Sequence, residues 1–194
     1  MSISIGRERE KSPAVEDGIL IFIFADMCMF ALFFLTYLME RNAQAALYIS
    51  SQAELNQTIG TINTLILLLS SWFVVLAVKA IKRNASRACA NFLALAFLCG
   101  AAFLVSKSFE YSGKIESGFT ILSNDFFMFY YIITGIHLAH VVGGMVILLI
   151  LFINAKKGKY NATNVSGIES GGMYWHMVDL LWVFIFPLIY FLGA

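Results

Sequence analysis

Long apolar stretches alternate with short polar segments along the whole chain. Five such stretches, each of about 20 residues or more, occupy 18–39, 59–80, 88–105, 126–154 and 172–193. An α-helix of about 20 residues is long enough to cross the ~30 Å hydrocarbon core of a bilayer. Because unpaired backbone N–H and C=O groups are too costly in lipid, each stretch is expected to be helical. The pattern therefore predicts an all-α protein, an integral membrane bundle of five transmembrane helices.

The connecting segments are short and polar, which predicts one compact unit. We expect residues 18–194 to form a single five-helix transmembrane domain, preceded by an N-terminal segment over 1–17. The first apolar stretch follows a segment of mixed charge with no small-residue cleavage site. It is therefore expected to remain in the protein as the first helix.

The distribution of basic residues predicts the orientation of the bundle. Alternate polar segments hold ten Lys and Arg residues in one set and three in the other. The richer set normally faces the cytoplasm, which places the N-terminus in the cytoplasm and the C-terminus outside. The first set is Arg7, Arg9, Lys11, Lys79, Lys82, Arg83, Arg87, Lys156, Lys157 and Lys159, and the second is Arg41, Lys107 and Lys114.

Composition agrees with a membrane protein and excludes one large class of partner. The chain is 60% hydrophobic and 13% charged, with a formal net charge of +1. Proteins that bind nucleic acid rely on a concentrated basic surface, and this chain has no such excess. No nucleic-acid partner is therefore expected.

A few ionisable or amide side chains lie within the apolar stretches, where they are costly and therefore informative. They are Asp26, Asn63, His137, His140, His176 and Asp179, with Glu110 at the far end of the third helix. Asp26 falls on an aromatic stripe, where a histidine is a suitable hydrogen-bond partner. At helical spacing, His137 and His140 share one face, and His176 and Asp179 can meet at i, i+3.

A second face of the fourth helix is lined by small residues. Gly135, Ala139 and Gly143 recur at every fourth position, a spacing that permits close packing of membrane helices. We therefore expect this stripe to be a helix-packing surface.

Two uses of the polar side chains are open from the residues themselves. Three histidines and nearby carboxylates meet the minimum number of ligands for copper, zinc or non-heme iron. Interhelical hydrogen bonding is the commoner use of such groups, and proton handling is a further one. We favour structural or proton-related roles and assign no catalytic, cofactor-binding or metal-binding residue to this chain.

Two segments are specific enough to indicate a family. They are "FFMFYYIITGIHLAHVVGG", from Phe126 to Gly144, and "YWHMVDLLWVFIFPLIYFLG", from Tyr174 to Gly193. They resemble subunit III of the heme-copper oxidases, which include cytochrome c and quinol oxidases. The resemblance covers most of the chain and extends to the Asp26 helix, to Asn63 and to the Glu110–Tyr111 pair.

The number of apolar stretches and one local sequence refine this resemblance. Mitochondrial-type subunits have seven helices, whereas this chain resembles the five-helix quinol-oxidase and nitric-oxide-reductase-associated forms. The segment "KSFEYSGKI", with the one that follows it, is most similar to the nitric-oxide-reductase-associated branch.

The resemblance implies a non-catalytic accessory subunit of a respiratory complex in the bacterial inner membrane. Such a subunit packs against a catalytic, heme-bearing subunit, stabilises it and supports proton uptake from the cytoplasmic side and electron transport. No cofactor is then expected in this chain. Heme, with copper or non-heme iron, belongs to the partner subunit, and bound phospholipid is a further expectation.

Two other functions compete with this one. A small proton-coupled transporter would use intramembrane Asp and His residues as proton sites, although no inverted repeat is visible. A copper-binding subunit of a membrane oxygenase would use Asp26, His137 and His140 as ligands. Flux measurements in liposomes and metal analysis of the purified chain separate these alternatives from the accessory-subunit function.

Overall fold

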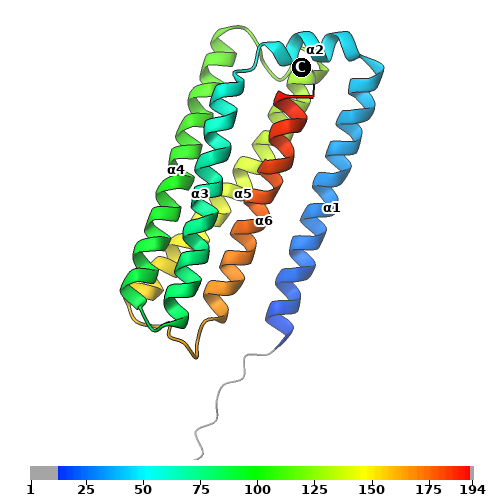
Figure 1. Ribbon diagram of the computed structural model, residues 1–194. Coiled ribbons are helices and arrows are strands. Elements are labelled where there is room, and N and C mark those ends of the chain that lie inside the picture. Colours follow the sequence, from blue (N-terminus) through cyan, green and yellow to red (C-terminus); the bar gives the residue numbers. More distant parts are fainter. Residues whose placement is uncertain (1–12, 193–194) are drawn as a thin grey trace, which may run out of the picture.

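The computed structural model describes residues 13–192, with side chains described from residue 18 onward, and contains six helices in this range (Figure 1). They are α1 (Pro13–Ala43), α2 (Ala45–Ala53), α3 (Gln57–Lys82), α4 (Ser86–Glu116), α5 (Asp125–Lys156) and α6 (Ser166–Tyr190). Most of the predicted N-terminal segment, 1–17, lies outside the described residues. The part that is described, from Pro13, already belongs to α1.

Within the described residues, five helices are long and apolar enough to cross a membrane: α1, α3, α4, α5 and α6. They run side by side, while the short α2 lies across one end of the bundle (Figure 1). This confirms the prediction of a five-helix bundle. We call the two ends of the bundle the α2 end and the opposite end, where the α3–α4 and α5–α6 loops lie.

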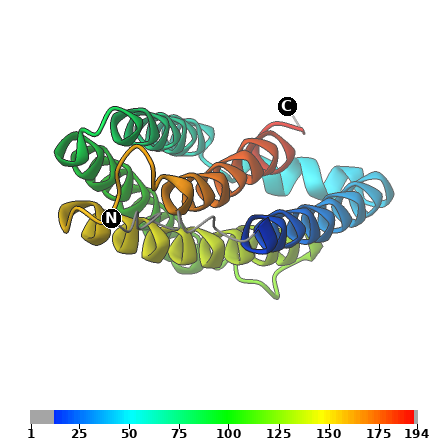
Figure 2. The same ribbon diagram turned by 90° about the horizontal axis from the view of Figure 1, so that it is seen from below.

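The bundle consists of a tightly packed group of four helices and one peripheral helix. Helices α3, α4, α5 and α6 pack against one another, whereas α1 contacts only α5 and α6 among them to any extent (Figure 2). The most buried of the five is α6, and its Trp175 and Trp182 are fully buried in the core. Much of α1 is exposed and presents apolar side chains outward.

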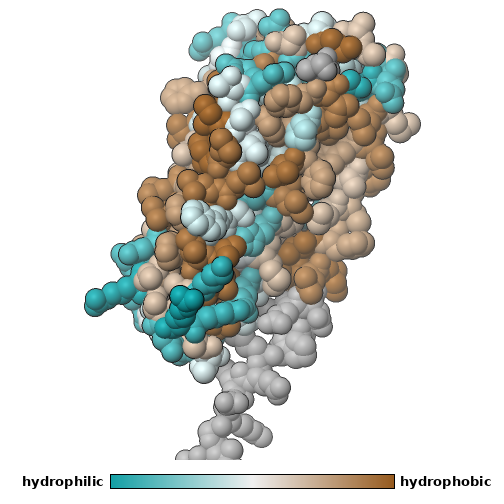
Figure 3. Space-filling model, viewed as in Figure 1, coloured by the Kyte–Doolittle hydropathy of each residue, from teal (hydrophilic) through white to brown (hydrophobic). Residues whose placement is uncertain are grey.

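The outer surface matches the expected position in a bilayer. Large apolar side chains are exposed along all five long helices, which would be unfavourable in water but not in lipid. Figure 3 shows one face of this surface, with apolar side chains over the middle of the bundle and hydrophilic ones toward its two ends.

The α2 end is closed by hydrogen bonds that join the first half of the chain to the last helix. The side-chain amide of Gln52 donates to the carbonyl of Ile189 at 2.6 Å, and that of Gln57 to the carbonyl of Tyr190 at 3.1 Å. Arg41 donates to the carbonyl of Leu192. These donors satisfy carbonyl groups that the end of α6 leaves without partners within the helix.

Two predicted boundaries differ from the structure more than the others do. Helix α4 continues to Glu116, well beyond the predicted end at residue 105, and α6 begins at Ser166 rather than at residue 172. In both cases the extra turns carry polar side chains that interrupt the apolar pattern. The helix α2 was not predicted, because it is short and its polar residues resemble a loop.

Candidate functional site

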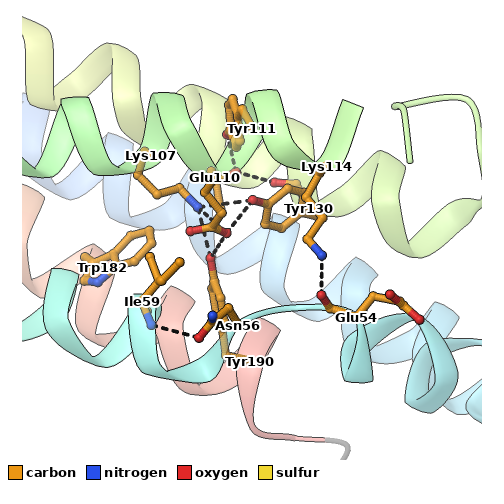
Figure 4. A network of polar contacts seen from close by, with 12 residues as sticks. Glu54, Asn56, Ile59, Lys107, Glu110, Tyr111, Lys114, Tyr130, Trp182 and Tyr190 are labelled. Atoms are coloured by element: carbon orange, nitrogen blue, oxygen red, sulfur yellow. Dashed lines mark hydrogen bonds and ion pairs between the residues drawn. The ribbon is translucent and has the colours of Figure 1, made fainter. Parts of the chain in front are cut away.

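A buried ion pair links three helices near the α2 end. The ammonium group of Lys107 on α4 lies 3.1 Å from a carboxylate oxygen of Glu110, one turn further along the same helix. Both side chains are almost completely buried, at 0% and 2% exposure. Tyr130 of α5 and Tyr190 of α6 both donate hydrogen bonds to Glu110, the first at 2.6 Å (Figure 4). We call these four residues the Lys107–Glu110 cluster.

Aromatic rings complete the surroundings of the Lys107 ammonium. Its nitrogen lies 5.0–5.6 Å from the ring centres of Tyr111, Tyr130, Trp182 and Tyr190. Rings at this distance attract a cation through their electron-rich faces. The charge of Lys107 is therefore balanced by one carboxylate and by aromatic rings from α4, α5 and α6.

This cluster corrects one step of the sequence interpretation. Lys107 was counted among the loop residues that report orientation, but it is fully buried inside α4. Lys107 was assigned to a loop because it and Glu110 interrupt the apolar run in the sequence. Only the folded structure shows that the two side chains form a buried ion pair. Without Lys107, the asymmetry becomes ten basic residues against two, so its direction is unchanged.

A contact between two ionisable side chains joins α1 to α5 near the middle of the bundle. The Nε2 atom of His140 lies 3.3 Å from a carboxylate oxygen of Asp26, and the two side chains are 16% and 14% exposed. The Nδ1 atom of His140 lies 2.9 Å from the carbonyl of Ile136. Asp26 therefore meets a histidine, as its position among aromatic residues suggested.

His137 points elsewhere, although it shares a helical face with His140. Its fully buried ring stands edge-on to Phe103 at 5.8 Å between centres and lies 5.3 Å from the ring of Trp182. Neither of its ring nitrogens has a hydrogen-bond partner among the described residues. The two histidines thus contact different neighbours and do not converge on one ligand position.

His176 and Asp179 do not pair with each other in the described structure. His176 Nδ1 instead lies 2.5 Å from the hydroxyl of Ser71 on α3. The Asp179 carboxylate is buried, at 3% exposure. No described residue meets it at hydrogen-bond distance and angle, and the same holds for the buried amide of Asn63.

Among the described residues, most of the small-residue stripe on α5 is open, and only Gly143 lies near a side chain of another helix. A Cβ atom at Gly135 would meet nothing within 4 Å, and one at Gly143 would meet only the hydroxyl of Tyr174. Ala139 is exposed. Close helix packing occurs instead at Gly144, where a Cβ would lie 2.7 Å from the ring of Trp175. Within this chain the packing surface therefore lies on the opposite face from the predicted one.

Among the described residues, no three His, Cys, Asp or Glu side chains come together in a group that could hold a metal ion. The ionisable side chains instead meet in pairs or lie singly between helices. These features define a class: a multi-pass helical membrane protein whose intramembrane polar groups connect helices to one another.

Comparison with known proteins identifies the family within this class. Residues 9–194 match the family described as cytochrome c oxidase subunit III. The chain belongs to this family, whose members are accessory subunits of heme-copper oxidases.

Several curated relatives extend over most of the chain. Cytochrome c oxidase subunit 3 of Thermostichus vulcanus is 32% identical over 176 residues, which cover 90% of this chain and 86% of the relative. The subunit 3 of a Synechocystis strain is 30% identical, with 90% and 74% covered. The subunit 3 of Alkalihalophilus pseudofirmus is 31% identical, with 91% and 86% covered.

Proposed function

We propose that this chain binds the heme-bearing catalytic subunit of its complex through its membrane-spanning helices, stabilising that subunit and supporting its proton uptake. The observation that carries the proposal is the family match over 9–194, together with a bundle long enough to span the membrane. The buried polar contacts support a structural role, because they fix the positions of the helices that a partner would meet.

The proposal assigns the redox centres to the partner. His137 and His140 contact different neighbours, and His140 is paired with Asp26. A metal ion bound by both histidines would require this pair to separate. Heme, together with copper or non-heme iron, is therefore proposed for the catalytic subunit, and none of these for this chain.

We further propose that the protein lies in the bacterial inner membrane with its N-terminus in the cytoplasm. The basic residues of the α3–α4 and α5–α6 loops gather at the end opposite α2, as the positive-inside rule requires of a cytoplasmic end. Asp26 and His140 join α1 to α5 in this arrangement, and we assign the pair a structural role in holding α1 to the rest of the bundle.

Purification of the complex tests the proposal. A chain with an affinity tag should copurify, in mild detergent, with a larger membrane protein that has a heme absorption spectrum. Disruption of the gene for the chain should lower the yield of that partner. Recovery of the tagged chain without any heme protein, at normal expression, would contradict the proposal.

The branch of the family is a separate proposal. The sequence "KSFEYSGKI" supports the nitric-oxide-reductase-associated branch, whereas the relatives compared above are named as subunits of cytochrome c oxidase. The purified complex should consume nitric oxide if this branch is correct. Consumption of oxygen alone would place the chain with the terminal oxidases.

A further inference from the structure

Two carboxylates from different helices approach each other at the α2 end of the bundle, where α2 lies across the long helices (Figure 1). Glu40 lies in the last turn of α1, and Asp125 is the first residue of α5. The side-chain nitrogen of Gln44, at the start of α2, lies 2.7 Å from an oxygen of Asp125 and 3.4 Å from an oxygen of Glu40. One uncharged amide group therefore bridges two like charges.

Neither carboxylate is neutralised by a cationic side chain. Among the described residues, no Lys, Arg or His forms an ion pair with Glu40 or Asp125. Arg41, which follows Glu40, donates instead to the carbonyl of Leu192. The unpaired carbonyls at the end of α1 add partial negative charge beside Glu40. Both carboxylates are also partly buried, so a cation at this position would be attracted more strongly than at an open surface.

A buried hydroxyl group without a partner lies beside the same carboxylates. The Tyr48 side chain of α2 is completely buried and packs against the rings of Tyr37 and Phe126. Its hydroxyl has no hydrogen-bond partner among the described residues. Burial, together with the nearby charges of Asp125 and Glu40, raises the pKa of this hydroxyl to about 12. Buried polar groups in proteins normally have a partner, which is often an ordered water molecule or an ion, so Tyr48 points to a ligand at the carboxylates.

We propose that Glu40 and Asp125 bind one Ca²⁺ ion, with the side-chain oxygen of Gln44 as a further ligand and the Tyr48 hydroxyl bonded to a water molecule of the ion. Half a turn of the Gln44 amide replaces its nitrogen by its oxygen, which converts a donor into a ligand. Ca²⁺ takes carboxylate, amide and water oxygens in a flexible geometry, whereas Mg²⁺ requires a near-ideal octahedron. Ligands from three separate elements therefore suit Ca²⁺ better.

The ion would have a structural role and would not be a redox centre. It would fasten the peripheral helix α1 to α5 at the α2 end, as the contact between Asp26 and His140 does near the middle. Only the folded bundle brings the two carboxylates together, so binding should stabilise the fold. The inference does not rest on the proposed function, because it concerns contacts within this chain alone.

Calorimetric titration of the full-length chain with CaCl₂ in mild detergent tests this site. We expect one Ca²⁺ per chain, with a dissociation constant on the order of 10⁻⁴–10⁻³ M, as in other Ca²⁺ sites of low affinity. Glu40→Gln and Asp125→Asn should each weaken binding about tenfold, because each removes one of the two charged ligands. Tyr48→Phe should weaken binding less, since it removes only a contact to bound water.

Thermal unfolding provides a second measurement. Ca²⁺ should raise the unfolding midpoint of the unmodified chain above its value in chelator, and K⁺ at matched ionic strength should not. The rise should be lost in Asp125→Asn. Each variant is compared with itself in the presence and absence of Ca²⁺, so a change in its intrinsic stability cannot imitate a loss of binding.

Glu54→Gln is the matched control, because Glu54 is an exposed acid at the same end of the bundle but outside the site. It should leave Ca²⁺ binding unchanged. The proposal is overturned if Glu54→Gln weakens binding as much as Asp125→Asn does, since the attraction would then be general to this end of the protein. Absence of binding at millimolar Ca²⁺, or unchanged affinity in both Glu40→Gln and Asp125→Asn, would also overturn it.

Discussion

At the scale of single residues, the Lys107–Glu110 cluster shows how a membrane protein keeps charges inside its core. A buried ion pair need not stabilise a protein more than apolar packing would, because removing two charges from water is costly. Removing only one partner is worse, since it leaves the other charge buried and uncompensated. Tyr130 of α5 and Tyr190 of α6 donate hydrogen bonds to Glu110, so the packing of these two helices also depends on the ion pair.

Glu110→Gln should therefore destabilise the bundle strongly. The expected loss is about 3–5 kcal/mol, because Lys107 would remain buried without a counter-charge. The midpoint of heat-induced unfolding in detergent measures the effect. Glu116→Gln is the control, since it removes the same charged group from the exposed end of the same helix.

The double variant Lys107→Met/Glu110→Gln tests whether the two charges act as a pair. It should be more stable than Glu110→Gln alone, because no unpaired charge remains and the carbonyl of the introduced amide can still accept hydrogen bonds from the tyrosines. Additive losses in the double variant would show that the charges stabilise the bundle independently.

Asp26 permits a test that separates structure from proton transfer. Asp26→Asn keeps the shape of the side chain and its position beside His140 but removes the ionisable proton. We expect the complex to assemble and to retain its turnover and pH dependence, since Asp26 lies among apolar and aromatic side chains beside its histidine. Turnover against pH, in complexes shown to retain the subunit, is the measurement. A fully assembled complex with a changed pH profile would assign Asp26 to proton uptake instead.

Asp26→Leu is the companion variant. It leaves His140 without its partner at a cost of about 1–3 kcal/mol, so less of the subunit should remain bound to the complex. A complex that retains the Leu variant fully would show that the pair is not needed for assembly.

Residue-scale interpretation of the sequence is most useful where a polar group has few possible neighbours. Asp26 was expected to need a donor such as a histidine, and His140 lies 3.3 Å from its carboxylate. The role of Lys107 could not be foreseen, because a lysine at the edge of an apolar run looks the same whether it faces solvent or a carboxylate. The separate surroundings of His176 and Asp179 were missed for a related reason: helical spacing allows a contact but does not require it.

At the scale of helices, glycine positions on α5 separate a packing face from an open one. Gly144→Ala would place its Cβ 2.7 Å from the Trp175 ring. This overlap should lower stability by about 1–3 kcal/mol, as is typical when a close-packed core is overfilled. Gly135→Ala, on the same helix, meets nothing within 4 Å and should leave stability unchanged or raise it slightly.

The two glycine variants can be compared by thermal unfolding of the isolated chain. Equal destabilisation by both would contradict the assignment of the two faces. A loss of partner binding by Gly135→Ala, without any loss of stability in the isolated chain, would show that the exposed stripe meets another subunit.

The helices themselves were largely predictable from hydropathy, because each apolar run must be long enough to cross the membrane. The ends of the helices were less predictable, because polar residues that pair inside the protein look like loop residues in the sequence. This explains why α4 extends past residue 105 to Glu116. Gly135, Ala139 and Gly143 share one helical face because of their spacing, but small size alone does not specify which neighbour covers that face, so a packing role for the stripe stays a prediction.

At the scale of the whole molecule, the remaining question is orientation. Cysteine labelling tests it at Lys157 of the α5–α6 loop and at Leu122 of the α4–α5 loop, both exposed, with Leu122 at 90%. In a Cys28→Ser background, Lys157→Cys should react only when the cytoplasmic side is accessible, and Leu122→Cys only from outside. Labelling of both positions from the same side would contradict five membrane crossings.

Closure of the α2 end has a consequence for biosynthesis. Gln52, Gln57 and Arg41 leave the ribosome early, but the carbonyls they bind belong to Ile189, Tyr190 and Leu192. Until the last helix enters the membrane, these donors can bond only to water or lipid headgroups, although the contacts of α2 with the start of α5, such as that between Asn124 and Ser51, can already form. Completion of α6 is therefore the event that closes the bundle. A chain that stalls before this point would present an open end to a membrane protease, even though its earlier helices are already inserted.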